Sequence, residues 1–330
     1  MEFPLRLPMK VHVTAVFVAV GAIWGSAWIP TASLSQTLPG LIAGALRFGL
    51  AALVLSIAAV LIRSSTPGKR RTPVLKLLGP SMVLGITMLG LPYALTLWAA
   101  DRVSPGMVAL CFGLMPLLVL FTEDEKSMGA IPAMALGIGG VAMMVDPGLS
   151  FRVQQAAGVA ALLGAVGLSG FSLDYVRRLY RQRRLLDSDL LSFSAIQLGV
   201  ASVFLAAMLA GTGQLSGSHW EGTAALPLAL LVVVVSGGTL PMLYWLLGRI
   251  TAPQAATLQW VATLVAVGEA AWQVGVRLGL EGWAGAALIL ACTSQLFFTA
   301  HRETIAPVTL EITKHTFPYS KASDIKRKSE

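Results

Sequence analysis

Long apolar stretches recur along this chain of 330 residues, and they constrain its fold more than any other feature of the sequence. Most contain about twenty residues, which is the length of α-helix needed to cross the hydrocarbon core of a bilayer. Only 12% of the residues are charged, about half the proportion in soluble domains, and the mean hydropathy is +0.74. A chain this apolar could not cover its surface in water, so we expect lipid to surround most of it. The stretches predict ten transmembrane helices, over Val11–Thr31, Leu41–Ile62, Leu75–Trp98, Val103–Thr122, Met128–Asp146, Ala156–Val176, Leu190–Ala210, Ala224–Leu247, Ile250–Ala270 and Glu281–Ala300.

A short motif occurs twice and indicates an internal duplication. The segments LWAADRVSPGMVAL and YWLLGRITAPQAATL each carry a Trp, an Arg four residues later, a β-branched residue and then a Ser or Thr. Trp98 and Trp245 are 147 positions apart, and so are Arg102 and Arg249. Two weaker matches, ALRFGLA with AIQLGVA and GAIWGSAW with GAVGLSGF, lie at offsets of 150 and 143, in the same order in both halves. A duplication of half the chain is the simplest cause.

The duplication defines the predicted domains and the predicted fold class. Residues 1–10 form a cytoplasmic leader, 11–148 a first five-helix repeat, 149–155 a linker, 156–300 a second five-helix repeat and 301–330 a cytoplasmic tail. Because five is odd, the second repeat must enter the membrane from the opposite face. We therefore expect an all-α integral membrane protein in which ten helices form two inverted repeats, an arrangement found in many secondary transporters.

The placement of Lys and Arg predicts the orientation of the helices. With ten crossings both chain ends lie on one side of the membrane, and 20 of the 24 basic residues fall on that side. The other side has Arg102, Arg152 and Arg277, and Arg47 lies within a helix. Basic residues are retained in the cytoplasm, so we expect a multi-pass protein of the cell inner membrane with both termini cytoplasmic. The strongest basic run, Arg177–Asp189, is expected to form a cytoplasmic loop.

Several chemistries lack the residues that they would need. Cys111 and Cys292 lie inside apolar stretches, so we expect no disulfide, and neither has a His or Cys neighbour at metal-ligand spacing. The net charge of +8 sits in short loops and the tail rather than on a face interleaved with aromatic residues, which argues against nucleic acid as a partner. The sequence contains no phosphate-binding P-loop, no HExxH and no Ser-His-Asp arrangement. We therefore predict no metal, no cofactor and no enzyme activity.

Motifs in both halves resemble those of a known transporter family. The segments AIWGSAWIP, LRFGLAALVL, RVSPGMVALCFGLMPLL and LGIGGVAMMV resemble the EamA-type drug/metabolite transporters, and RITAPQAATL, GEAAW and GWAGAALILA extend the resemblance into the second half. The resemblance implies ten helices, a central cavity between the halves, and export of small metabolites or amino acids. Glu123 and Glu269 stand where the family often has an acidic residue at a helix end. The family usually has a second-half proline matching Pro116, whereas this chain has Thr263 near that place.

Aromatic and weakly polar residues within the apolar stretches are the candidates for contact with a solute. A buried indole N–H or amide needs a hydrogen-bond partner, and prolines near the two tyrosines break the helix backbone beside them. Ser26 and Ser169 also suit close packing of helices. Trp98 and Trp245 fit either a gate or an interfacial aromatic belt. The expected cavity residues are Trp24, Ser26, Tyr93, Ser169, Tyr244, Gln259 and Trp260.

Arg47 is the most costly residue in the apolar stretches, because an uncompensated charge within a bilayer costs about 3 kcal/mol or more. One interpretation is a structural anchor whose side chain extends to the interface, with Asp101 as a partner. The other is a group that binds the carboxylate of an exported amino acid. Gln197 takes its place in the other half, so the charge is not required by the repeat.

Together these features favour a secondary transporter that exports small neutral, zwitterionic or aromatic metabolites by alternating access. Its expected partners are a small-molecule solute and the lipid bilayer, while its oligomeric state stays undetermined. A proton or the membrane potential would drive uphill transport, but the apolar stretches offer no carboxylate at mid-depth, so facilitated diffusion stays open. The alternative is a membrane scaffold that transports nothing, or a membrane-embedded enzyme.

Overall fold

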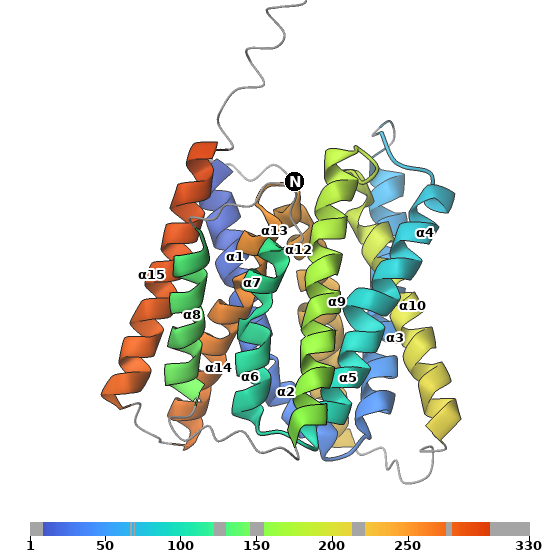
Figure 1. The fold of residues 1–330 in the computed structure, drawn as a ribbon. Coiled ribbons are helices and arrows are strands. Elements are labelled where there is room, and N and C mark those ends of the chain that lie inside the picture. The colour runs from blue at the N-terminus through green and yellow to red at the C-terminus, as the bar shows by residue number, and fades with distance from the viewer. Residues whose placement is uncertain are drawn as a thin grey trace, which may run out of the picture.

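The computed structural model describes residues 9–66, 68, 70–121, 130–145, 155–212, 222–274 and 279–303, and every regular element within them is a helix (Figure 1). Two segments are π-helical, η1 (Gly85–Gly90) and η5 (Leu231–Gly238), and two are short 3₁₀ turns, η3 (Asp187–Asp189) and η4 (Gly222–Ala224). The α-helices are α1 (Met9–Ser26), α2 (Trp28–Ser35), α3 (Gly40–Ser65), α4 (Val74–Leu84), α5 (Leu91–Ala100), α6 (Pro105–Gly113), α7 (Met115–Leu120), α8 (Ala130–Val145), α9 (Ala156–Arg181), α10 (Leu190–Thr212), α11 (Ala225–Leu230), α12 (Thr239–Leu247), α13 (Ala252–Ala256), α14 (Leu258–Val274) and α15 (Leu280–Glu303).

Six helical stretches in the described residues are long and apolar enough to cross a membrane, so the protein is a multi-pass membrane protein. They are Val11–Ser35, Gly40–Ser65, Val74–Ala100, Ala156–Arg181, Asp187–Gly211 and Gly222–Leu247. Two further apolar helices, Pro105–Leu120 and Ile131–Met143, are shorter. Residues 1–8 of the expected leader, Glu123, residues 149–154 of the linker and residues 304–330 of the tail lie outside the described residues.

Helix ends differ from the sequence prediction by a few residues, and two of the differences change where charged residues lie. A loop was expected to begin at Arg177, but α9 continues through Arg181. Long Arg side chains can lay their apolar stems along a helix while the charged heads stay in water, so the charges do not end the helix. The second difference concerns the helix expected to end at Ala270, which continues to Val274. Glu269 therefore lies more than one turn inside α14 rather than at its end.

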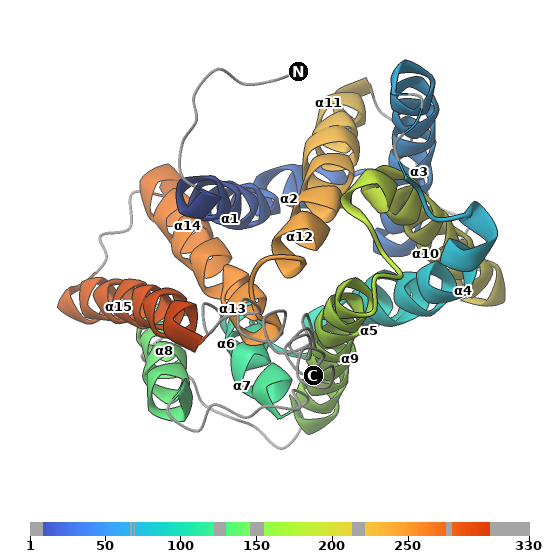
Figure 2. The same ribbon diagram turned by 90° about the horizontal axis from the view of Figure 1, so that it is seen from above.

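Helices from the two halves of the chain pack side by side. α3 lies against α10, α8 against α15, α1 against α14 and α5 against α9, as the view along the bundle in Figure 2 shows. The start of α1 and the end of α15 lie at the same end of the bundle (Figure 1). The broken helix α6–α7 runs toward that end, whereas the broken helix α13–α14 runs away from it (Figure 1).

Each π-helical segment precedes a proline. Pro92 follows η1 and Pro241 follows η5, each within three residues. A proline inside a helix lacks an N–H, and its ring clashes with the carbonyl group four residues earlier. The wider π turn moves that carbonyl aside, so the helix continues past the proline with a local distortion.

The duplicated Trp–Arg motif has the same local structure in both halves. The guanidinium of Arg102 stacks on the ring of Trp98, with its Cζ 3.8 Å from the ring centroid, and the corresponding distance from Arg249 to Trp245 is 3.9 Å. Each Arg also donates through Nη1 to the carbonyl oxygen of its own Trp, at 2.6 Å and 2.8 Å. The shared geometry explains why the spacing of Trp and Arg is the same in both copies.

A second shared feature is the start of the helix that follows each motif. The hydroxyl oxygens of Ser104 and Thr251 cap α6 and α13 by accepting the N–H of Met107 and of Gln254, both at 3.3 Å. A proline follows each cap within the first two helical positions, where the missing N–H has no helical partner to lose.

The buried side chain of Trp260 fixes α14 to the first half of the chain. It is 0% exposed, and its indole N–H donates to the carbonyl oxygen of Gly113 at 2.9 Å, at the break between α6 and α7. Its ring lies against Gly137 of α8, where a Cβ atom would overlap the indole. One large side chain therefore joins three helices.

We predict that Gly137→Ala lowers the free energy of unfolding by about 1–3 kcal/mol, because the added methyl group overpacks against Trp260. Gly139→Ala, two residues along the same helix, is the matched control, since a Cβ atom there meets nothing within 4 Å. That control should be neutral or stabilising by up to about 1 kcal/mol through helix propensity. Thermal unfolding of detergent-purified protein tests this, and equal effects of the two substitutions would contradict the packing described.

Candidate functional site

Polar side chains of α1 and α3 contact hydroxyl groups of η5 and α12 where η5 passes into α12. Arg47 on α3 donates from Nε to Ser236 Oγ at 2.7 Å, and Trp24 on α1 donates from its indole N–H to Thr239 Oγ1 at 2.8 Å. The Thr239 hydroxyl in turn donates to the carbonyl oxygen of Val235. We call Trp24, Arg47, Ser236 and Thr239 the η5 cluster. It joins residues that are 189 and 215 positions apart.

The positive charge of Arg47 has no acidic partner within ion-pair distance among the described residues. The expected partner, Asp101, is exposed at the end of α5, and Arg47 instead contacts Ser236. The ring centroid of Phe48 lies 5.5 Å from the guanidinium carbon. A single neutral hydroxyl does not balance the charge, and the two Nη groups are suited to pair with a carboxylate in a bidentate geometry.

A second polar cluster lies at η1. Gln197 on α10 donates through Nε2 to Met88 Sδ at 3.7 Å, and the Tyr244 hydroxyl donates to Gln197 Oε1. Both Gln197 and Tyr244 are completely buried. We call Met88, Gln197 and Tyr244 the η1 cluster. Arg47 and Gln197 occupy matching positions in the two halves, and each contacts the π-helical segment of the opposite half.

Ser26 contacts a carboxylate at the close approach of α1 and α14. Its hydroxyl donates to Glu269 Oε1 at 2.5 Å. The helices approach closely because Gly25 presents no side chain: a Cβ atom there would lie 2.6 Å from the Val265 Cβ atom. The other carboxylate oxygen, Glu269 Oε2, is buried and has no hydrogen-bond partner among the described residues. An acidic group that the sequence analysis placed at a helix end is therefore held between two apolar helices.

Four expected cavity residues lie outside these contacts. Tyr93 is half-buried against α3, and its hydroxyl donates to the carbonyl oxygen of Gly40 at 3.4 Å. Trp260 belongs to the packed interior described above. Ser169 on α9 and Gln259 on α14 are half-buried, and neither side chain forms a hydrogen bond with another described residue.

The two Trp–Arg turns differ in one interaction. Arg249 Nη2 lies 2.5 Å from Asp187 Oδ2, so the turn after α12 is tied to the connection between α9 and α10. Trp245 beside it is half-buried. In the first half Trp98 is 44% exposed, and Arg102 forms no ion pair with a described residue. Trp98 and Trp245, the two residues expected at gates or in an interfacial belt, therefore differ in their surroundings: the turn at Trp245 is fixed by an ion pair, and the turn at Trp98 is not fixed by one among the described residues.

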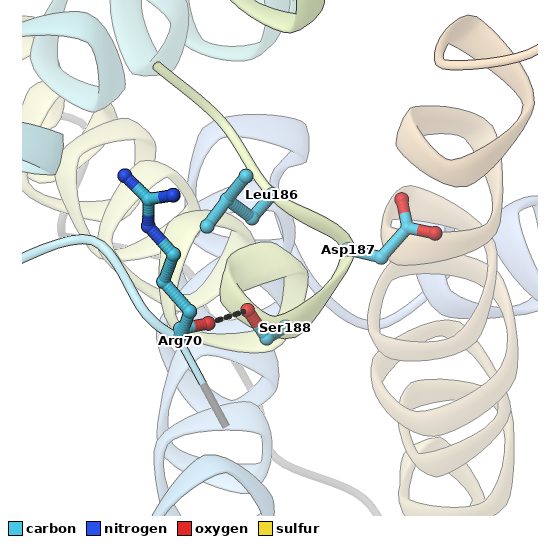
Figure 3. Close-up of a pocket in the computed structure, with 4 residues that line it drawn as sticks. All are labelled: Arg70, Leu186, Asp187 and Ser188. Atoms are coloured by element: carbon cyan, nitrogen blue, oxygen red, sulfur yellow. Dashed lines mark hydrogen bonds between the residues drawn. The ribbon is translucent and has the colours of Figure 1, made fainter. Parts of the chain in front are cut away.

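A pocket of about 450 Å³ lies at the connection between α9 and α10 and is lined by Arg70, Leu186, Asp187 and Ser188 (Figure 3). Ser188 Oγ donates to the carbonyl oxygen of Arg70 at 2.8 Å, so loops from the two halves are joined there. The charged groups of Arg70 and Asp187 point away from one another (Figure 3). This pocket lies beside the helix ends, away from the residues expected to line a central cavity, so we build the candidate site on the polar clusters.

Ser236, Thr239 and Asp187 were not among the site residues predicted from the sequence. A Ser or Thr in an apolar stretch has the same pattern as a residue that only packs, and Asp187 lay within a basic run read as a determinant of orientation. One available signal was the segment SGGTLP, in which two hydroxyl residues flank two glycines just before a proline. Such a segment breaks regular helix and leaves backbone groups that hydroxyls can satisfy.

These observations define a class of protein: an all-helical membrane protein, in the part of the chain that the structure describes, whose polar groups pair across the bundle. Comparison with known proteins shows a likeness to one family. Residues 13–124 match the model of the EamA-like transporter family, so this part of the chain carries a domain of that family.

Two curated relatives carry weaker likeness over a longer region. The chain is 23% identical over 209 residues to protein PagO of Salmonella typhimurium, which covers 60% of this chain and 64% of that protein. It is 22% identical over 205 residues to an uncharacterized transporter of Buchnera aphidicola, which covers 59% of this chain and 64% of that protein. The aligned region thus spans less than two thirds of each relative.

A solved crystal structure supports the fold. It superposes with a TM-score of 0.70 over 90% of this chain and 99% of the other chain, at 16% sequence identity. The likeness concerns the arrangement of helices alone.

We predict that Gln197→Leu lowers the free energy of unfolding by about 1–3 kcal/mol, because the buried Tyr244 hydroxyl keeps only the sulfur of Met88, 3.5 Å away, as an acceptor. Adding Tyr244→Phe should recover much of that loss, since both partners then become apolar. A double-mutant cycle on thermal unfolding measures the coupling. A double variant whose loss equals the sum of the single losses would argue against the bond.

Proposed function

We propose that this protein is a secondary transporter that exports small zwitterionic, neutral or aromatic metabolites, such as amino acids, by alternating access. One observation carries the proposal: the same set of structural features occurs in both halves of the chain, and the two sets run in opposite directions across the bundle. Each half has a π-helical segment before a proline, a stacked Trp–Arg turn and a broken helix, and the two broken helices run opposite ways (Figure 1). Two units related in this way can exchange conformations, which exchanges the face that is open.

The proposed architecture consists of ten crossings in two inverted five-helix repeats, residues 11–148 and 156–300, with a cavity between them. The position of the start of α1 and the end of α15 at one end of the bundle supports an even number of crossings (Figure 1). Cross-half contacts support the twofold relation, because Arg47 reaches η5 and Gln197 reaches η1. The distribution of basic residues supports cytoplasmic termini in the cell inner membrane.

The η5 cluster supports a solute with both an apolar and an anionic part. Arg47 provides an unbalanced positive charge, Trp24 an aromatic face, and Ser236 and Thr239 hydroxyl groups. A carboxylate that paired with Arg47 would balance its charge inside the apolar bundle, which favours amino acids and aromatic acids over cations. Trp24 and Arg47 come from the first half and their partners from the second, so movement of the halves would open or close the site.

The transport experiment uses purified full-length protein in liposomes, preloaded with unlabelled solute and offered the same labelled solute, across a panel of amino acids and nucleosides with L-phenylalanine first. We expect saturable counterflow. Arg47→Gln should raise the KM for carboxylate solutes at least tenfold, because the charge pair with the solute is lost. Arg63→Gln, an exposed residue near the end of the same helix, is the matched control and should leave the KM unchanged.

Flat uptake by the wild-type protein over the whole panel would contradict the transport proposal and favour a scaffold. Counterflow that is indifferent to Arg47→Gln would instead contradict only the assignment of the carboxylate site.

We predict the orientation from the same architecture. Green fluorescent protein fused after Glu330 should fluoresce in cells, and alkaline phosphatase fused at that position should be inactive, because both chain ends lie in the cytoplasm. The opposite pattern at the tail, with a leader that stays inside, would make the number of crossings odd and would remove the inverted repeat.

A further inference from the structure

Glu269 is the one charged residue of α14, and it lies in the interior of that helix. It lies eleven positions after Leu258, where the helix starts, which corresponds to about 16 Å, and five positions before Val274. Neither the family match nor the proposed solute site gives this carboxyl group a role. Its place between two apolar helices therefore needs a physical explanation.

The carboxyl group is held on one side and unsatisfied on the other. Ser26 donates to Oε1 at 2.5 Å, while Oε2 is buried without a hydrogen-bond partner among the described residues. An ionised carboxylate is costly in apolar surroundings unless its oxygens are bonded or its charge is removed. A proton on Oε2 removes the charge and leaves Oε1 as the acceptor of the Ser26 bond. The geometry suits a group that gains and loses a proton.

The elements packed against α14 are α1, α6, α8, α13 and α15, and they provide no counter-charge near Glu269 in the described residues. α6, α8 and α13 contain no charged residue. On α1, His12 lies fourteen residues before Ser26, about 21 Å along the helix, and on α15 Glu281 is exposed in the first turn. The other titratable or charged positions on these elements are Lys10, Cys111, Cys292, His301, Arg302 and Glu303.

The Ser26–Glu269 contact joins the two halves of the chain. In an alternating cycle, separation of α1 from α14 would break this bond and expose the carboxylate to water, and closure would bury it again. The close packing at Gly25 makes this a contact that is either fully made or lost, since there is no flexible side chain between the helices. Access of the carboxyl group to water is therefore linked to the movement that carries the solute.

We propose that Glu269 is the proton-binding residue of this carrier and exchanges one proton for each solute exported; this rests on the proposed transport function. A proton from the outer solution adds to Oε2 while the site faces outward. The same proton leaves Oε2 for the cytoplasm after the site has turned inward, and the solute moves the other way. One O–H bond forms and breaks, and no electron is transferred.

The first experiment uses liposomes that contain the purified full-length protein and are acidic inside. Wild-type protein should accumulate tritiated L-phenylalanine as protons leave, and Glu269→Gln should reduce this gradient-driven accumulation at least tenfold. Exchange of labelled for unlabelled phenylalanine moves no net proton, so it should stay within twofold in the variant. Glu281→Gln, the exposed glutamate of α15, is the matched control and should change neither measurement. Undiminished gradient-driven accumulation in Glu269→Gln would overturn the proposal.

The second experiment needs no solute, so it separates failure of this proposal from failure of the transport function. N,N′-dicyclohexylcarbodiimide modifies protonated carboxyl groups in apolar surroundings, and mass spectrometry of the treated chain locates the modified residue. Glu269 should be labelled at acidic pH and progressively less as the pH rises, while the exposed Glu281 should stay unmodified.

Absence of labelling at Glu269 at every pH would overturn the proposal even if transport occurs. Labelling without counterflow of any solute in the panel would support proton binding and overturn the transport function. The midpoint of thermal unfolding of each variant should match that of the wild type. This match would show that the fold survives the substitution.

Discussion

Backbone groups within a bilayer have no water to bond, so every interruption of a helix there must be repaired by the protein itself. This constraint accounts for the polar residues of the bundle. The hydroxyl of Thr239 bonds the carbonyl of Val235 in the π-helical segment, and the indole of Trp260 bonds the carbonyl of Gly113 where α6 ends. Thr257 donates to the carbonyl of Gln254 at 2.7 Å between α13 and α14. The interruptions bring polar groups into an apolar interior, and the candidate site is built from those groups.

The short helix α12 links the two polar clusters. Thr239, in its first position, belongs to the η5 cluster, and Tyr244, five residues later, belongs to the η1 cluster. A shift of α12 therefore disturbs both sets of contacts together. Gln197 and Tyr244 of the η1 cluster are completely buried and belong to the packed interior, whereas the half-buried Arg47 of the η5 cluster has donor groups that no described residue accepts. The same helix thus carries one set of contacts that stabilises the fold and one that is suited to a solute.

Hydropathy alone predicted the all-helical character of the described residues, and six of the predicted stretches are long and apolar enough to cross a membrane. It predicted their ends less well: Arg177 and Arg181 extend α9 beyond the apolar run, and α14 outlasts its expected end, which places Glu269 inside a helix. The hydrogen-bond partners of the polar side chains were the feature least predictable from the sequence. Trp24 was expected to need a hydrogen-bond acceptor, but its acceptor Thr239 lies 215 residues away. A single sequence shows which groups need a partner, whereas packing decides which distant residue supplies it.

The difference in ion pairing between the two Trp–Arg turns has an energetic consequence. Arg249 pairs with Asp187, whereas Arg102 forms no ion pair with a described residue, so this interaction stabilises one end of the bundle and not the other. A partly exposed ion pair contributes about 0.2–1 kcal/mol, enough to shift a two-state balance by up to about fivefold. For a carrier, such a bias means that the empty protein rests mostly on one side of its cycle. The same solute would then half-saturate the inner and outer faces at different concentrations, although the equilibrium it reaches across the membrane would be unchanged.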